Sequence, residues 1–301
     1  MTPIGGRRGS SPRDAGERPA GAVDVTLTGA PALLYLYGIV EAGTEGERLL
    51  ANRAVSGLDP REPLFPITVG DLVAAVSRVP SATFEEEPLN ALLTDLPRLA
   101  PLAVQHEDAV RALLPAAPAL VPMAFGTVYR GPERVEALLR ERAEEFRTLL
   151  ERVRGKYEWG LRVYRDDARW LATVNESSDE LCRLASEIAQ ASPGRAYLLR
   201  KRRERLRAAA ADRLAAEALA AIFGRLESLS AAARRNAVGA AAPGPTRLML
   251  SAALLVDATA ADAFRAIAAE LARAYEPQGV SVQLTGPWAP YSFVGQDYGA
   301  A

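Results

Sequence analysis

The chain has 301 residues, of which 49% are hydrophobic and 24% charged, and its 36 Lys and Arg nearly balance its 37 Asp and Glu. A formal net charge of -1 argues against nucleic acid or an anionic membrane as the main partner, since both attract strongly basic surfaces. The single cysteine, Cys182, excludes an internal disulfide and fits a reducing compartment. No run reaches the ~18 apolar residues of a membrane helix. We expect a cytoplasmic protein whose length favours two cores.

The N-terminal part begins with a segment that has no apolar periodicity. Residues 1–30 are rich in Gly, Pro, Ser and Arg, a composition that predicts a disordered tail. The apolar, aromatic run 33–40 is too short for a helix and predicts a strand buried on both faces. Residues 67–79 then predict a hairpin that turns at a Gly-Asp pair. Ordered structure is therefore expected from about residue 31.

Two helices and another strand complete the first predicted domain. An apolar stripe at steps of three and four predicts a helix over 99–113, and a short strand is expected over 120–124. Residues 126–129 are expected to lead into a helix of about six turns over 132–153. Strand, hairpin, helix, strand and helix in this order indicate a ferredoxin-like α+β domain over 31–155.

The second predicted domain, 156–301, begins with a strand over 157–164. An Ala-, Arg- and Leu-rich stretch then predicts long helices over about 178–234. Strand 248–256, a helix over 262–275 and an alternating strand over 280–284 follow. The chain is thus predicted to be an α+β protein of two ferredoxin-like domains, the second with a long helical insertion, behind a disordered tail.

His106 is the only histidine and has acidic neighbours, Glu107 and Asp108, so it could serve as a general base. However, it shares the apolar stripe with Ala103 and Val110, and the two carboxylates point elsewhere on the helix. A packed histidine with a hydrogen bond is the better interpretation. We therefore predict no catalytic residue and no enzymatic activity.

Neither a metal nor a cofactor site is predicted. One histidine and one cysteine are too few for a zinc site of those ligands. A site for Mg²⁺ or Ca²⁺ made only of carboxylates remains open, but the three glutamates 85–87 are typical of a solvated helix start. No glycine-rich phosphate loop precedes a helix.

The strongest local charge lies between Arg200 and Arg207, where six of eight residues are basic. Such a helix could bind nucleic acid, but the run holds no aromatic residue for base stacking. A solvated helix face, or contact with an acidic protein, is the favoured interpretation.

Two prolines and three large aromatic residues follow the last predicted strand, in the segment 286–293. We expect the segment to cover the second core, with Trp288 closing it and the prolines limiting the backbone. Because Trp and Tyr are frequent anchors of protein interfaces, Trp288, Pro290, Tyr291 and Phe293 are also candidate interaction residues.

Three separated motifs resemble the GvpL/GvpF family of gas vesicle proteins. The first is Leu-Tyr-Gly-Ile-Val at 36–40, with Asp-Leu-Val-Ala-Ala-Val-Ser at 71–77. The second is His-Glu-Asp-Ala-Val at 106–110, continued by Val-Pro-Met-Ala-Phe-Gly-Thr-Val at 121–128, which includes Phe125. The third is Leu-Thr-Gly-Pro-Trp-Ala-Pro-Tyr-Ser-Phe at 284–293. The resemblance covers roughly residues 33–294.

The resemblance implies an accessory or minor structural protein that is needed to assemble gas vesicles. It implies binding to the small hydrophobic shell protein and to other gas vesicle proteins, with no cofactor and no catalytic residue. Two alternatives remain: a ferredoxin-like enzyme or ligand-binding protein that uses His106, and a helical nucleic-acid binder that uses Arg200 to Arg207.

Overall fold

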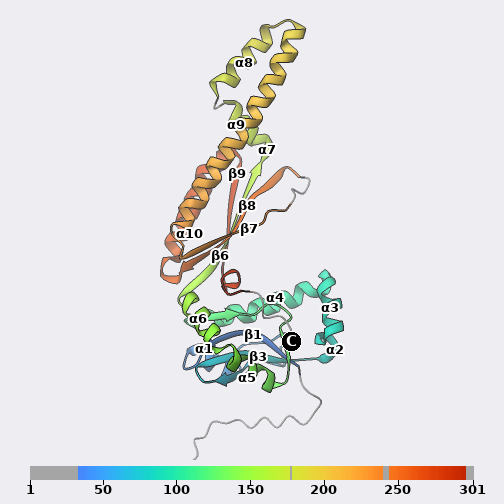
Figure 1. Cartoon of the computed structure of the whole chain (residues 1–301), viewed down its shortest axis with the longest axis vertical. Coiled ribbons are helices and arrows are strands. Elements are labelled where there is room, and N and C mark those ends of the chain that lie inside the picture. The colour runs from blue at the N-terminus through green and yellow to red at the C-terminus, as the bar shows by residue number, and fades with distance from the viewer. Residues whose placement is uncertain (1–32, 177, 240–243, 296–301) are drawn as a thin grey trace, which may run out of the picture. The chain divides into compact units, whose positions relative to one another are not determined.

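A computed structural model describes residues 33–176, 178–239 and 244–295 (Figure 1). The tail expected over 1–30 lies outside these residues. The described part is a mixed α+β structure with two antiparallel sheets, one of five strands and one of four. None of its helices is long and apolar enough to cross a membrane.

The first sheet has the strand order β2-β3-β1-β4, and β5 also pairs with β1. Each of these pairings is antiparallel. The elements of this part are β1 (Leu33–Glu41), α1 (Glu45–Ala51), β2 (Phe65–Val69), β3 (Leu72–Val79), α2 (Ser81–Phe84), α3 (Glu86–Thr94), α4 (Leu96–Leu113), β4 (Leu120–Pro122), β5 (Val128–Arg130), α5 (Pro132–Glu141) and α6 (Ala143–Val153).

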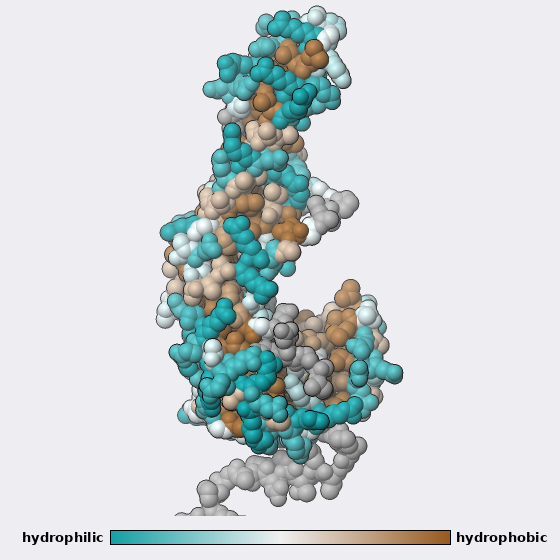
Figure 2. All heavy atoms as spheres, in the orientation of Figure 1, coloured by the Kyte–Doolittle hydropathy of each residue, from teal (hydrophilic) through white to brown (hydrophobic). Residues whose placement is uncertain are grey.

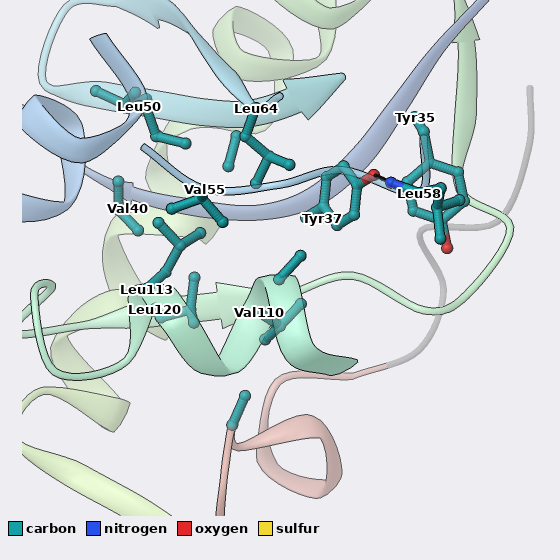
Figure 3. Packing of buried hydrophobic residues seen from close by; sticks show 14 of the residues in the cluster. Tyr35, Tyr37, Val40, Leu50, Val55, Leu58, Leu64, Val110, Leu113 and Leu120 are labelled. Carbon is teal, nitrogen blue, oxygen red and sulfur yellow. Dashed lines mark hydrogen bonds between the residues drawn. The ribbon is translucent and has the colours of Figure 1, made fainter. Parts of the chain in front are cut away.

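β1 is buried on both faces, as its run of apolar and aromatic residues predicts. Tyr35 and Tyr37 point to one face, where Val110 of α4 and Leu50 of α1 complete a core (Figure 3). Leu36, on the other face, joins a second core that α5 and α6 cover. A strand in the middle of three layers needs apolar side chains at successive positions, not at alternate ones.

Gly38 of β1 occupies a position where a side chain does not fit. The register of β1 against β3 shifts between Leu36 and Gly38. A Cβ on Gly38 would lie 2.9 Å from the Val121 carbonyl oxygen of β4. The bulge and the close approach of β4 therefore both depend on the missing side chain.

The second sheet has the strand order β7-β8-β6-β9, again with antiparallel neighbours. Its elements are β6 (Lys156–Asp166), α7 (Asp167–Glu176), α8 (Asp179–Gln190), α9 (Pro193–Glu227), β7 (Ala232–Asn236), β8 (Thr246–Asp257), η1 (Ala258–Ala260), α10 (Ala261–Tyr275), η2 (Glu276–Gln278), β9 (Val280–Trp288) and η3 (Tyr291–Phe293).

The core of the second sheet lies between its strands and the helices α7, α9 and α10. Leu161 of β6 and Leu254 of β8 meet Ile222 of α9 and Phe264 of α10 there. Trp170 of α7 is buried in the same core and donates its indole N–H to the Ala211 carbonyl at 3.2 Å. The polar atom of this large side chain is thereby satisfied.

Several predicted boundaries were wrong. The helix expected over 132–153 is two helices, α5 and α6, separated at Arg142, where ψ is 22°. Of residues 126–129, expected to lead into that helix, 128 and 129 belong to β5 beside β1. The helices expected to run to about 234 end at Glu227, and the edge strand β7 follows. The short helix α1 was not anticipated.

Candidate functional site

A buried group of hydroxyls lies around His106, and β1 supplies two of its members. Tyr35 and Tyr37, two residues apart on one strand face, are both fully buried. The Tyr35 hydroxyl lies 3.0 Å from Nδ1 of His106 and accepts the Gly126 N–H at 2.9 Å. Burial raises the pKa of the Tyr35 phenol, so this hydroxyl keeps its proton at neutral pH.

His106 is held at both ring nitrogens. Its Nε2 lies 3.1 Å from the hydroxyl of Tyr291, while Nδ1 faces Tyr35. A neutral imidazole satisfies two such contacts by donating at one nitrogen and accepting at the other. Burial lowers the pKa of His106 from 6.5 to about 4, because the charged form loses its hydration. The structure thus places His106 as a packed, hydrogen-bonded residue.

Aromatic rings surround the imidazole. The Tyr37 ring stacks on it with centroids 5.7 Å apart, and Phe125 meets it edge-on at 5.9 Å. Phe125 is half-buried and packs against the same core as Tyr35. The second motif of the sequence therefore contributes two side chains, His106 and Phe125, to one cluster.

Tyr37 joins the loop before β2 to the sheet. Its hydroxyl lies 2.9 Å from Oγ of Ser77. The same hydroxyl accepts the Leu58 N–H at 2.8 Å (Figure 3). Tyr35 and Tyr37 are not among the residues predicted from the sequence to form a site. Two tyrosines at alternate positions of a strand buried on both faces are the signal that was available, because each buried hydroxyl requires a partner.

The segment after β9 makes contacts with both sheets. Ala289 is buried in the core that Tyr35 shares, whereas Phe293 packs against Ala253 and Leu255 of β8. Pro290, between them, is also buried. The segment 289–293 consequently ties the end of the chain to residues far away in sequence.

Glu158 of β6 fixes this segment. Its carboxylate accepts the backbone N–H and the hydroxyl of Ser292, each at 2.7 Å. Burial raises the pKa of Glu158, and the two bonds from Ser292 offset part of the rise. Burial likewise raises the pKa of Glu107, which the neighbouring Tyr291 hydroxyl partly counters. Two carboxylates with raised pKa values therefore flank the segment.

Trp288 does not close the second core, contrary to expectation. It is half-buried, and its ring faces the Arg111 guanidinium at 4.8 Å from carbon to centroid. Trp288 and Tyr157 line a hollow of about 390 Å³ with Pro115 and Pro287. The register of β6 against β9 shifts between Glu158 and Gly160, and this bulge turns the tryptophan away from the core.

The basic run lies on α9, where part of its charge is paired within the chain. Arg202 forms an ion pair with Glu180 of α8 at 3.0 Å, and Lys201 forms one with Glu204 at 3.2 Å.

In the described residues, no group of three His, Cys, Asp or Glu side chains could hold a metal ion. The geometry supports an arrangement of mutual structural contacts around His106.

The sequence profile described as "Gas vesicle synthesis protein GvpL/GvpF" matches residues 33–295. Among curated proteins, "Gas vesicle protein L" of Streptomyces sp. (strain CB03234) is 36% identical over 242 residues, covering 78% of this chain and 84% of that protein. "Gas vesicle protein L1" of Halobacterium salinarum (strain ATCC 700922 / JCM 11081 / NRC-1) is 27% identical over 269 residues, covering 86% and 89%.

Two crystal structures resemble the fold. The gas vesicle protein GvpF from Anabaena sp. PCC7120 aligns with a TM-score of 0.63 at 17% identity, covering 88% of this chain and 98% of that one. GvpF from Microcystis aeruginosa aligns with a TM-score of 0.60 at 18% identity, covering 88% and 100%. At these identities the likeness concerns the fold alone.

Proposed function

The chain belongs to the GvpL/GvpF family of gas vesicle synthesis proteins, and from this membership we propose that it is a non-catalytic assembly factor or minor structural component of the gas vesicle. In this role it binds the small hydrophobic shell protein and other gas vesicle accessory proteins. It acts in the cytoplasm, at the growing vesicle.

The observation that carries a non-catalytic role is the environment of His106. Both ring nitrogens are engaged by phenols, Tyr35 and Tyr291, in a buried cluster. A general base must reach the proton it removes within hydrogen-bond distance, and here the reachable groups are side chains of the protein itself. The cluster supports a role in holding the segment 289–293 in place.

We further propose that both sheets are ferredoxin-like and form two domains, 31–155 and 156–301. In chain order each has strand, helix, strand, strand, helix, strand, and each sheet has its first strand between the third and the fourth. This is the split β-α-β arrangement, with α7, α8 and α9 as the extended first crossover of the second domain. Separate expression of the two parts and their hydrogen-exchange protection test this division.

Co-purification of the full chain with the shell protein tests the proposed binding. A tagged wild-type chain is expected to retain the shell protein, with an unrelated ferredoxin-like domain as the negative control. Retention by both proteins, or by neither, contradicts a specific interaction. The nucleic-acid alternative is tested in the same preparation: steeply salt-dependent binding of DNA or RNA by wild type, lost when Arg202, Arg203 and Arg207 are changed to Glu, would favour it.

A further inference from the structure

We propose that this chain binds a second copy of itself head to tail, with the outward face of α9 docking on the acidic end of α3. We call the outward face of α9 the arm face; it consists of Tyr197, Leu198, Lys201 and Arg205. We call the surface of α3 the head face; it consists of Glu86, Leu89, Asn90 and Leu93, with Glu85 and Leu96 at its ends. This self-association goes beyond the proposed function and does not rest on it.

Each face combines exposed apolar groups with charges that are mainly of one sign. On the arm face the exception is Glu204, which pairs with Lys201 at 3.2 Å and leaves Arg205 as the cation without an intramolecular ion pair among the described residues. Seven large hydrophobic side chains are exposed among the described residues, and four of them belong to the two faces. Leu93 (43% exposed) and Leu96 (71%) lie on the head face, and Tyr197 (58%) and Leu198 (68%) on the arm face. Figure 2 shows hydrophobic surface over α3, and hydrophobic patches among hydrophilic ones over α8 and α9. Apolar groups clustered in this way mark interaction sites more often than scattered ones do.

Helical spacing places the members of each face together. Tyr197, Lys201 and Arg205 follow one another at steps of four, and Leu198 lies beside them. The opposite side of α9, which includes Ala196 and Leu199, is less exposed, as expected for a helix that packs against α8. The arm face therefore points away from α8, which packs against the opposite side of α9.

Charge complementarity selects a second copy as the occupant. The exposed Glu85 and Glu86 form no ion pair within the described ranges, and neither does the exposed Arg205. One guanidinium, Arg130, lines the same surface as the two glutamates, so the head face stays acidic. In a contact between two molecules, the glutamates of one head face would lie opposite the basic side chains of another arm face, so that each charge has a partner of opposite sign.

A hollow beside the head face can take an aromatic side chain. It measures about 390 Å³ and is lined by Phe84, Glu85, Leu89 and Val128, among others. Tyr197, the exposed aromatic of the arm face, has an apolar ring and a polar tip that suit such a mixed lining. Since the two faces differ, each contact leaves one arm face and one head face free, so the copies either form an open chain or close into a ring, the smallest of which is a reciprocal dimer.

Sedimentation velocity of the full chain, over a wide range of concentrations and at two salt concentrations, tests the proposal. Wild type is expected to associate more strongly at higher concentration and less at high salt. Changing Glu85 and Glu86 to Lys, or Lys201 and Arg205 to Glu, should weaken association about tenfold or more. All four positions are exposed, so each variant should melt within a few degrees of wild type, which reports correct folding. A small decrease is expected for the Glu85 and Glu86 changes, because both residues lie at the N-terminal end of α3.

Mixing the two charge-reversed variants gives the decisive result. Each variant alone carries two faces of like charge, whereas an equimolar mixture offers opposite charges again and should regain wild-type association. Tyr197→Ser should weaken association at every salt concentration, while Leu229→Ser, at an exposed leucine outside both faces, should not. A wild type that stays monomeric throughout, or reversed variants that associate as wild type does, overturns the proposal. So does a mixture without rescue.

Discussion

The pH dependence of stability should depend on His106, the single histidine of the chain. Its pKa is about 4 in the folded protein and 6.5 when unperturbed. Between pH 7.5 and 5.0 the unfolded chain therefore takes up most of a proton that the folded chain does not. The free energy of unfolding therefore decreases as the pH is lowered from 7.5 to 5.0, and His106 accounts for about 2 kcal/mol of this loss.

His106→Gln removes this proton while keeping a side chain that can donate and accept. Urea unfolding of wild type and variant at pH 7.5 and at pH 5.0 gives four free energies of unfolding. At pH 7.5 we expect the variant to be about 1–2 kcal/mol less stable, as is usual for a change within a buried polar cluster. At pH 5.0 that difference should shrink to nearly zero or change sign.

Other groups near the imidazole do not obscure the comparison. Glu107 and Glu158 have raised pKa values, so they favour folding as the pH falls, which is the opposite sign. Both are present in wild type and variant, and they cancel in the difference. Equal pH dependence of the two proteins would refute the claim that His106 is buried in its neutral form.

Two paired substitutions test the assignment of core and bulge. Trp170→Ala removes a buried tryptophan and should lower the free energy of unfolding by about 3–5 kcal/mol. Trp288→Ala, at a half-buried position, should lower it clearly less. Equal losses in urea unfolding would contradict the described cores. Gly286→Ala should destabilise more than Gly70→Ala in thermal melts, because its Cβ would lie 2.9 Å from the Glu158 carbonyl oxygen while that of Gly70 meets nothing within 4 Å. The reverse order would contradict the close approach at Gly286.

The sequence predicted the central strands because their signals are local. β1, β6 and β8 are apolar or alternating runs of strand length, and each lies in the interior of a sheet. β7 escaped prediction because Ala232–Asn236 has no apolar alternation. Its residues are those of a continuing helix, and pairing with β8 overrides that propensity.

The sequence predicted some members of the site, but not Tyr35 and Tyr37 and not the contacts between the members. His106, Phe125, Pro290 and Tyr291 were all singled out, yet nothing in the sequence joins positions as far apart as Tyr35 and Tyr291. The misplacement of Trp288 has a local cause. Alternation from Val280 would turn it inward, but a bulge near Gly286 changes the register.

The role in vesicle formation is tested most directly by replacing the gene in its own host. We predict that a strain without it forms few or no gas vesicles, and that wild type and His106→Gln both restore them, as counted by electron microscopy. Normal vesicles in the deletion strain would contradict a role in assembly. Failure of a folded, normally expressed His106→Gln protein would contradict the proposed non-catalytic role.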